Sequence, residues 1–262
     1  MADADALLRQ GDIDGARAAL VEAVRASPAD QRLRMFLFQL LAVNGEWDKA
    51  RNQLQSLVQI SPQAQMLSVT YNQVLDAEVQ REAVFAGTAE AVLLAGSGGW
   101  ADGIAKALSR FGAGKVAEAE ALRDAAFDAA PDMHGDCDGI RFDWIGDCDS
   151  RFGPTLEIIL GGRYGLVPFD MVKAITSTGP DDLRDTIWCP VEVEFANGHG
   201  AAAFLPARYP GSEKSASSLE RLGRVTEWVE CDWGQQGFGQ RIWSFSGGED
   251  RGILEFRKIE FD

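Results

Sequence analysis

An internal repeat near the start of the chain restricts the possible folds more than any other part of the sequence. Residues 11–28 and 45–62 align at an offset of 34 positions and share Gly, Asp, Ala, Arg, Leu, Val, Ser and Pro at equivalent places. A unit of this length holds two helices joined by a turn. Because one such unit cannot bury its apolar face alone, successive units are expected to stack against each other.

The shared residues have recognisable structural roles. Gly11 and Gly45 lie where the first helix of each unit must end, because glycine readily adopts the left-handed conformation found after helix termini. Pro28 and Pro62 end the second helix, since the residue before a proline avoids the helical conformation. Small and apolar side chains follow one helical face between these points, namely Ala16, Leu20 and Val24 in the first copy and Ala50, Leu54 and Val58 in the second.

A third and weaker copy of the repeat runs from Gly114 to Pro131. Ala119 and Phe127 occupy the positions of the alanine and the valine, whereas Arg123 stands where leucine is expected. The helical pattern is thus predicted to continue to Pro131.

One long or broken helix is predicted between the second and third copies. The stretch 63–95 has helical periodicity, and its apolar face consists of Met66, Leu67, Tyr71, Val74 and Leu75. A period of 34 residues is that of the tetratricopeptide repeat. Residues 1–131 are therefore predicted to form a tetratricopeptide-like helical repeat domain.

The second half of the chain has a different character, with more glycine, aromatic and β-branched residues. Short helices are expected at 181–186 and 217–222, and the glycine-rich stretch 234–239 is expected to be a hairpin loop. The fold class is predicted to be α+β, with residues 132–262 forming a mainly antiparallel sheet or partly open barrel. Turn-bounded runs predict strands at 140–145, 155–160, 164–168, 191–195, 202–205, 226–230, 241–245 and 252–259.

The net charge of −15 argues against several classes of partner. Nucleic acids and anionic membrane surfaces are bound by clustered lysine and arginine, which this composition does not favour. No apolar run approaches the length of a membrane-spanning helix, and the acidic start of the chain is unlike a secretory signal. The protein is therefore expected in the cytoplasm, where its four cysteines would be reduced thiols, namely Cys137, Cys148, Cys189 and Cys231.

An acidic cysteine motif occurs twice in the second half. Gly135-Asp136-Cys137-Asp138 recurs as Gly146-Asp147-Cys148-Asp149, and His134 precedes the first copy. Thiolates with histidine would suit zinc, and carboxylates would suit calcium. However, the sequence has no Cys-x-x-Cys pair, and the calcium-loop spacing is incomplete. These residues are therefore expected to build loops around a strand, and no metal ion or other cofactor is expected.

Two further patterns could carry chemistry. Residues 96–101, Gly-Ser-Gly-Gly-Trp-Ala, match a loose dinucleotide-binding fingerprint, but the preceding sequence is helical where a strand is required. Cys148 and His134 could form a nucleophilic pair, although no third group is suggested to orient the histidine. A hydrolase with a cysteine or carboxylate site in the C-terminal half therefore remains the alternative to a non-catalytic binding protein.

Aromatic residues beside arginines are the candidates for protein contacts. Arg163-Tyr164 and Arg208-Tyr209 fall in predicted loops, and these residue types dominate the energetics of protein interfaces. Solvated arginines at strand ends are the competing interpretation. Five of the seven tryptophans also lie in the second half, namely Trp144, Trp188, Trp228, Trp233 and Trp243.

Several short motifs in the second half occur in a characteristic order. They are Trp144–Pro154, Gly162–Tyr164 with Val167–Phe169, Asp182–Asp185 with Trp188, Arg208–Glu213, Thr226–Trp228 and Gly239–Arg241. This series resembles the ImpE/TagJ family, also called SciE-type proteins, and the helical first half agrees with that family. Cys148 departs from the pattern, because a small residue such as alanine is expected between the two aspartates.

The resemblance implies a cytoplasmic accessory protein of bacterial type VI secretion. It implies association with the contractile sheath, through its small subunit of the TssB/VipA type, and with ClpV, the ATPase that recycles the sheath. It implies no enzymatic activity. Repeat helices commonly form a concave groove for a partner helix or peptide, so an adaptor with salt-sensitive binding to a basic ligand is expected. A self-associating scaffold is a further hypothesis.

Overall fold

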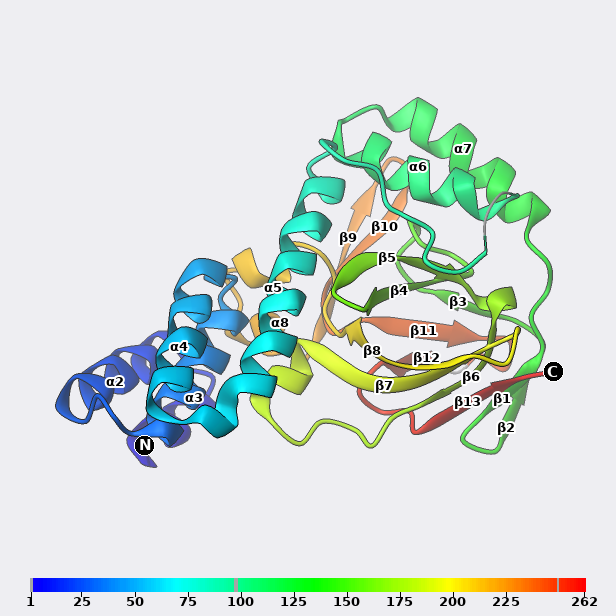
Figure 1. Cartoon of the computed structure of the whole chain (residues 1–262). Helices are drawn as coiled ribbons and strands as arrows, with labels where there is room; N and C mark the ends of the chain where they lie inside the picture. The colour runs from blue at the N-terminus through cyan, green and yellow to red at the C-terminus, as the bar shows by residue number, and fades with distance from the viewer. Residues whose placement is uncertain (1, 97–98, 249) are drawn as a thin grey trace.

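The computed structural model describes residues 2–96, 99–248 and 250–262. Helices form one side and the top of the molecule in Figure 1, and antiparallel strands form the other side. The N-terminal part contains α1 (Ala2–Arg9), α2 (Ile13–Ala26), α3 (Gln31–Val43), α4 (Trp47–Ile60), the short 3-10 turn η1 (Pro62–Ala64), α5 (Gln65–Phe85), α6 (Ala101–Gly112) and α7 (Val116–Ala129).

Three pairs of helices are joined by tight turns at glycine. Gly11, Gly45 and Gly114 have φ angles of +83°, +67° and +71°, a conformation that glycine adopts at no steric cost. Ala16 and Leu54, from the repeat pattern, are fully buried in the packed pairs. The prediction of tetratricopeptide-like repeats is confirmed, because the turns and the buried positions follow the sequence period.

The stretch between the repeats forms one long helix, α5, as predicted. Tyr71, Val74 and Leu75 are buried on its inner face. Met66 was expected on the same face, but that prediction is wrong, because its side chain is 76% exposed near the first turn of the helix. Gly87 follows the helix with a φ of +73°, which reverses the chain.

The segment after α5 is extended, so the predicted helix does not continue to residue 95. The N–H of Leu94 donates to the carbonyl of Leu166 (2.9 Å), and the N–H of Leu166 donates to the carbonyl of Val92 (2.8 Å). The chain then reaches α6 at Ala101. Ser97 and Gly98 of the glycine-rich fingerprint lie outside the described residues.

The C-terminal part consists of short strands with short helical turns between them. The strands are β1 (Gly135–Cys137), β2 (Ile140–Phe142), β3 (Ile145–Asp147), β4 (Thr155–Leu160), β5 (Arg163–Pro168), β6 (Val172–Thr176), β7 (Trp188–Phe195), β8 (Gly200–Pro206), β9 (Thr226–Cys231), β10 (Gly234–Gly239), β11 (Ile242–Phe245), β12 (Asp250–Gly252) and β13 (Lys258–Phe261). The helical turns are η2 (Phe169–Met171), η3 (Leu183–Thr186), η4 (Ser212–Lys214) and α8 (Ser218–Arg221).

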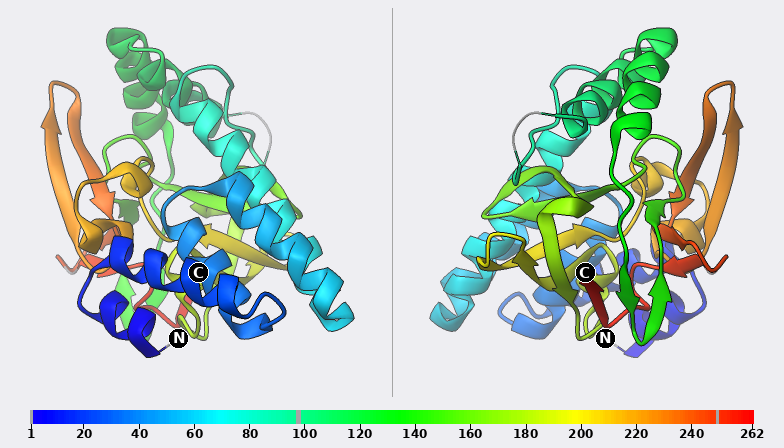
Figure 2. Two further views of the ribbon diagram at one scale, coloured as in Figure 1. Left: turned by 90° about the vertical axis from the view of Figure 1, so that its left-hand side faces the viewer. Right: turned by 90° about the vertical axis from the view of Figure 1, so that its right-hand side faces the viewer.

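Three sheets are assembled from these strands. The largest has eight strands in the order β2-β1-β13-β6-β7-β8-β4-β5, the second has the order β12-β11-β3, and β9 with β10 forms a separate hairpin. The pairs within these sheets are antiparallel. Figure 2 shows the β9–β10 hairpin in orange at one side of the molecule. The α+β prediction is confirmed, and the large sheet is open rather than closed into a barrel.

The structure corrects two of the strand predictions, and a physical reason is visible for the first. The stretch 234–239 is the strand β10 and not a loop, and a Cβ on Gly237 would lie 2.3 Å from the ring of Tyr209. Glycine here permits a close approach of the backbone to a ring instead of a turn. The predicted strand 252–259 is divided between β12 and β13. The strand β6 was not predicted.

Two apolar clusters fill the interior. One lies between the eight-stranded and three-stranded sheets and includes Leu205 and Trp243. The other joins the helices to the opposite part of the large sheet and includes Phe38, Trp188 and Tyr209. Residues from both sides of Pro131 therefore share a core, and the division into domains 1–131 and 132–262 stays a prediction.

Candidate functional site

A groove of about 890 Å³ crosses the helical part of the molecule. Its lining comes from α1, α3, the end of α4, the start of α5 and the loop before η3, and we call it the helical groove. Its apolar side chains are Leu8, Met35, Phe36, Leu57, Ala64, Leu67 and Leu183, and its charged ones are Asp5, Arg32, Asp181 and Asp182. Apolar side chains with a charged rim suit an amphipathic helix or peptide.

One wall of the helical groove is contributed by the β-rich part. Asp182 caps η3, and its side chain and that of Asp185 form a reciprocal capping box. The turn places Arg184 against α3, with its guanidinium 3.6 Å from the sulfur of Met35. The same guanidinium lies 5.1 Å from the ring centre of Tyr71 on α5. The groove therefore depends on the position of the two parts relative to each other.

The inner side of the repeat helices is partly filled by the chain itself. The ring centre of Trp188, at the start of β7, lies 6.1 Å from that of Trp47 and 5.8 Å from that of Tyr71. The indole N–H of Trp188 donates to Glu78 on α5 (2.7 Å). A partner protein can therefore contact only the part of the helical surface near α1 and α3, and not the whole inner face of the repeat helices.

A cluster of buried charges connects α5 to the β-rich part, and we call it the charge cluster. Arg81 on α5 donates to both carboxylate oxygens of Glu157 on β4, at 2.6 and 3.2 Å. Arg241 forms ion pairs with Glu157 and with Asp147. Glu78 lies 3.5 Å from Arg81. These five side chains are at most 8% exposed, so their charges are shielded from solvent.

The burial of these groups changes their acidity. Burial raises the pKa of Asp147 to about 6, although Arg241 opposes the rise. Burial also raises the pKa of Glu78, against the opposing effect of Arg81. Burial acts in the same sense on Glu157, but Arg81 and Arg241 together hold its pKa below the usual value. Glu157 is therefore the carboxylate that the two arginines stabilise most strongly.

Three of the four residues predicted as protein contacts are buried, so the structure does not leave their side chains accessible to a partner. Tyr164 is 3%, Arg208 3% and Tyr209 0% exposed. The hydroxyl of Tyr209 donates to Asp147 (3.0 Å) and accepts from the N–H of Ile242 (3.0 Å). These side chains therefore make contacts inside the molecule, where aromatic rings and arginines also pack together.

Arg208 and Arg163 differ in environment. Arg208 donates to the carbonyl of Val43 at the end of α3 (2.8 Å) and to that of Arg221 at the end of α8. Burial lowers the pKa of Arg208 to about 10. Arg163 is exposed at the start of β5, so it alone of the four predicted contact residues remains a surface candidate.

The tryptophans likewise include both buried and exposed residues. Trp188 and Trp243 are buried core residues, whereas Trp144 is 46% exposed. Trp233 lies in the turn of the β9–β10 hairpin and contacts Phe111 of α6, with ring centres 4.7 Å apart. Arg123, the departure from the third repeat, donates to the carbonyl of Trp233 (2.7 Å).

The acidic cysteine motifs do not assemble into a metal site among the described residues. In the second motif, Asp147 pairs with Arg241, and Asp149 accepts two hydrogen bonds from the guanidinium of Arg151 at 2.9 and 2.7 Å. Burial raises the pKa of Cys148 to about 12, which disfavours the thiolate that a metal or a nucleophile needs.

The Cys148–His134 pair, which was the alternative nucleophilic site, does not form in the described structure. His134 lies 3.7 Å from Asp143. Cys148 accepts from the side-chain amide of Gln235 at its carbonyl (2.8 Å) and donates its N–H to Ile242. The two residues therefore have different neighbours, and the arrangement offers no activated thiol.

Sequence reasoning missed the charge cluster and most of the helical groove. A signal for the cluster was present in α5, because Glu78 and Arg81 continue the spacing of buried residues that includes Val74 and Ala77. Charged residues at apolar-face positions indicate buried ion pairs. The groove had no comparable signal, since Met35 and Leu183 are far apart in the sequence.

None of the helices in the described ranges has the length and apolar composition that a membrane-spanning helix requires.

Comparisons with known proteins agree with this architecture. The family model described as ImpE protein matches residues 139–260, and a tetratricopeptide repeat model matches residues 7–70. A crystal structure of a protein from Vibrio parahaemolyticus has the same fold, with a TM-score of 0.88 and 21% identity, covering 99% of this chain and 97% of that one.

A curated relative extends the similarity over the whole chain. The type VI secretion system accessory component TagJ of Pseudomonas aeruginosa is 39% identical over 259 residues, which cover 99% of this chain and 91% of the relative. Because the similarity includes both the helical and the β-rich parts, the chain belongs to the ImpE/TagJ family.

Proposed function

We propose that this protein is a non-catalytic, cytoplasmic accessory component of a bacterial type VI secretion system. The observation that carries the proposal is the 39% identity to the accessory component TagJ across 99% of the chain. The arrangement of the site supports a binding role rather than a hydrolase, because the pKa values of Cys148 and Cys137 are raised by burial to about 12 and about 11.

The proposed partner is the small sheath subunit of the TssB/VipA type, bound through a helix in the helical groove. The groove offers Met35 and Phe36 to the apolar side of such a helix, and Asp5 and Asp181 to its basic side. The net charge of −15 favours a basic ligand and salt-sensitive association. The ATPase ClpV is proposed as a second partner in the same pathway.

The test is retention of the purified sheath subunit, and separately of ClpV, by the immobilised full-length protein at low salt. Phe36→Glu introduces a charge into the helical groove and should weaken retention of the sheath subunit about tenfold or more. Val229→Glu, at a 48% exposed position on β9, is the matched control and should bind normally. Circular dichroism verifies that both variants fold.

Two results would contradict this proposal in different ways. No retention of any secretion component by the unaltered protein would argue against the adaptor role itself. Normal retention by a folded Phe36→Glu variant would argue against the helical groove as the binding surface.

A further inference from the structure

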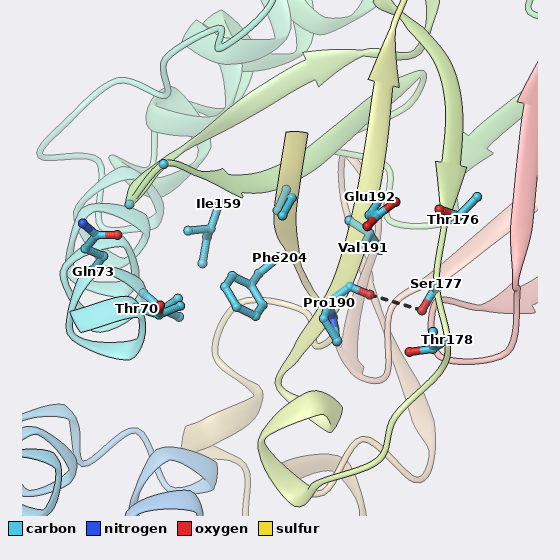
Figure 3. A pocket seen from close by; sticks show the side chains of 15 residues that line it. Thr70, Gln73, Ile159, Thr176, Ser177, Thr178, Pro190, Val191, Glu192 and Phe204 are labelled. Atoms are coloured by element: carbon cyan, nitrogen blue, oxygen red, sulfur yellow. Dashed lines mark hydrogen bonds between the residues drawn. The ribbon is translucent and has the colours of Figure 1, made fainter. Parts of the chain in front are cut away.

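The outer face of the large sheet contains a second groove, separate from the helical groove. A hollow of about 620 Å³ lies between α5 and the strands β4, β8, β7 and the end of β6. Figure 3 shows Thr70 and Gln73 of α5 on one side, Ile159 and Phe204 in the middle, and Thr176 on the other side. We call this surface the sheet groove.

The sheet groove continues along the strands into a shallower hollow of about 570 Å³. The two hollows share Thr176, Glu192 and Ala202. The uncovered part of the sheet is thus long enough for more than one side chain of a bound segment to rest on it.

Strand register places two acidic side chains along the floor of this groove. Glu192 is paired with Thr176 of β6 and Ala202 of β8, and Glu194 is paired with Ala174 and Gly200. Paired residues of antiparallel strands point to the same face. Each carboxylate therefore lies between small neighbours, which leave it accessible and allow a bound backbone to approach the sheet.

The two carboxylates have no opposing charge in the described structure. Glu192 and Glu194 are exposed, and neither forms an ion pair within the described residues. The nearby Lys258, which is paired with Thr176 in the strand register, forms an ion pair with Glu260 at 2.8 Å. This part of the sheet therefore presents unneutralised negative charge beside the apolar surface of Phe204.

We propose that the sheet groove is a second protein-docking surface, which binds a basic amphipathic segment of a partner protein. Lysine or arginine side chains of the segment would pair with Glu192 and Glu194, and an apolar side chain would occupy the hollow over Phe204. This goes beyond the proposed function, because it gives the molecule two binding surfaces on different elements.

Charge decides among the possible occupants of the sheet groove. A second copy of this chain, related by a two-fold axis, would bring the same carboxylates together and repel itself. A nucleic acid would be repelled by the same groups. A cationic peptide segment gains attraction, with an association that weakens as salt rises.

The test uses a defined probe, a helical peptide with leucine along one face and lysine along the other. Its binding to the full-length protein is measured by fluorescence anisotropy at low and high salt. A peptide with glutamate in place of lysine is the matched control and should not bind. The double variant Glu192→Lys/Glu194→Lys should weaken binding of the lysine peptide at least about tenfold.

A second double variant separates a specific site from general attraction. Glu227→Lys/Glu230→Lys makes the same change of net charge at exposed positions of β9 and should bind the lysine peptide within about twofold of the unaltered protein. Equal losses in both double variants would overturn the proposal, as would unchanged binding by Glu192→Lys/Glu194→Lys.

The helical groove is also proposed to take a basic amphipathic helix, so the peptide titration is repeated in the Phe36→Glu background, in which that groove is impaired. There the lysine peptide should still bind, and adding Glu192→Lys/Glu194→Lys should still weaken its binding. If Phe36→Glu abolishes peptide binding and Glu192→Lys/Glu194→Lys does not, the peptide binds the helical groove and the sheet groove proposal is wrong.

Discussion

Between the eight-stranded and three-stranded sheets lies an apolar cluster of buried side chains, with Leu205 and Trp243 among them. Between α5 and the same large sheet, buried arginines and carboxylates meet, with Arg81 and Arg241 sharing Glu157. One interior thus excludes water with apolar surface, and the other brings charges out of water and pairs them.

The two interiors differ in how strongly they fix the geometry of the parts that they join. Apolar contacts are not directional and tolerate substitutions of similar volume. Hydrogen-bonded ion pairs are directional, and a buried charge that loses its partner is costly. We infer that the charge cluster fixes the position of the helices on the sheet, and with it the wall of the helical groove formed by Asp181, Asp182 and Leu183.

The largest expected effect is from removal of the shared carboxylate. Glu157→Ala leaves two buried guanidiniums without their common partner and should lower the free energy of unfolding by about 3–5 kcal/mol. Glu157→Gln keeps the shape of the side chain but removes its charge, so this substitution should still be clearly destabilising. Urea unfolding followed by tryptophan fluorescence measures both. A loss below about 1 kcal/mol in Glu157→Ala would show that water replaces the carboxylate.

The apolar interior should tolerate a substitution of similar volume better than the charge cluster does. Leu205 is fully buried, and Leu205→Ala should cost about 2–5 kcal/mol through lost contacts and a cavity. Leu205→Met, which conserves volume, should cost less than about 1.5 kcal/mol. If Leu205→Met is as damaging as Leu205→Ala while Glu157→Gln is neutral, the contrast between the two interiors fails.

A smaller effect should appear in the pH dependence of stability. The pKa of Asp147 is raised to about 6 in the folded protein, so the folded state binds this proton more tightly than the unfolded state does. The stabilising contribution is complete below the unfolded pKa and is lost as pH rises through about 6. Glu157, whose pKa is lowered, acts in the opposite sense at more acidic pH.

Asp147→Asn isolates this contribution. The unfolding free energy of the natural protein should fall relative to that of Asp147→Asn as pH rises from about 5.5 to about 7.5. Parallel urea titrations at each pH provide the comparison. A constant difference across this range would mean that Asp147 does not titrate there.

The smallest effect is expected at an exposed ion pair, which serves as the reference for charges that remain in water. Arg25 and Glu22 on α2 lie 2.6 Å apart, with side chains 71% and 70% exposed. Arg25→Ala should change the free energy of unfolding by no more than about 0.5 kcal/mol. A thermal melt is sufficient to detect a larger loss, which would remove the distinction between buried and exposed pairs.

Local patterns made much of the fold predictable. The turn glycines and the alanine–leucine spacing identified the helical pairs because a helix is determined by neighbours in sequence. The strand β4 was predicted with its observed bounds, 155–160. By contrast, β10 was taken for a loop, because Gly237 accommodates the ring of Tyr209, a contact that the local sequence does not reveal.

The candidate site was less predictable, because its chemistry depends on partners distant in sequence. Tyr164 and Arg208 look like surface residues beside loops until the structure buries them against α5 and the ends of α3 and α8. The same holds for Arg123, which departs from the repeat and instead contacts the β9–β10 hairpin. The resemblance of short motifs identified the family, although it assigned no role to these residues.

The charge cluster also has a consequence for the order in which the chain folds. Arg81 and Glu157 are 76 positions apart in sequence, and Arg241 and Asp147 are 94 apart. Contacts of such long range form late, after the local helical pairs. During synthesis, α5 leaves the ribosome long before Arg241 does. Arg81 and Glu78 therefore remain hydrated until Glu157 and Trp188 have been synthesised, and the charge cluster is completed only when Arg241 has followed.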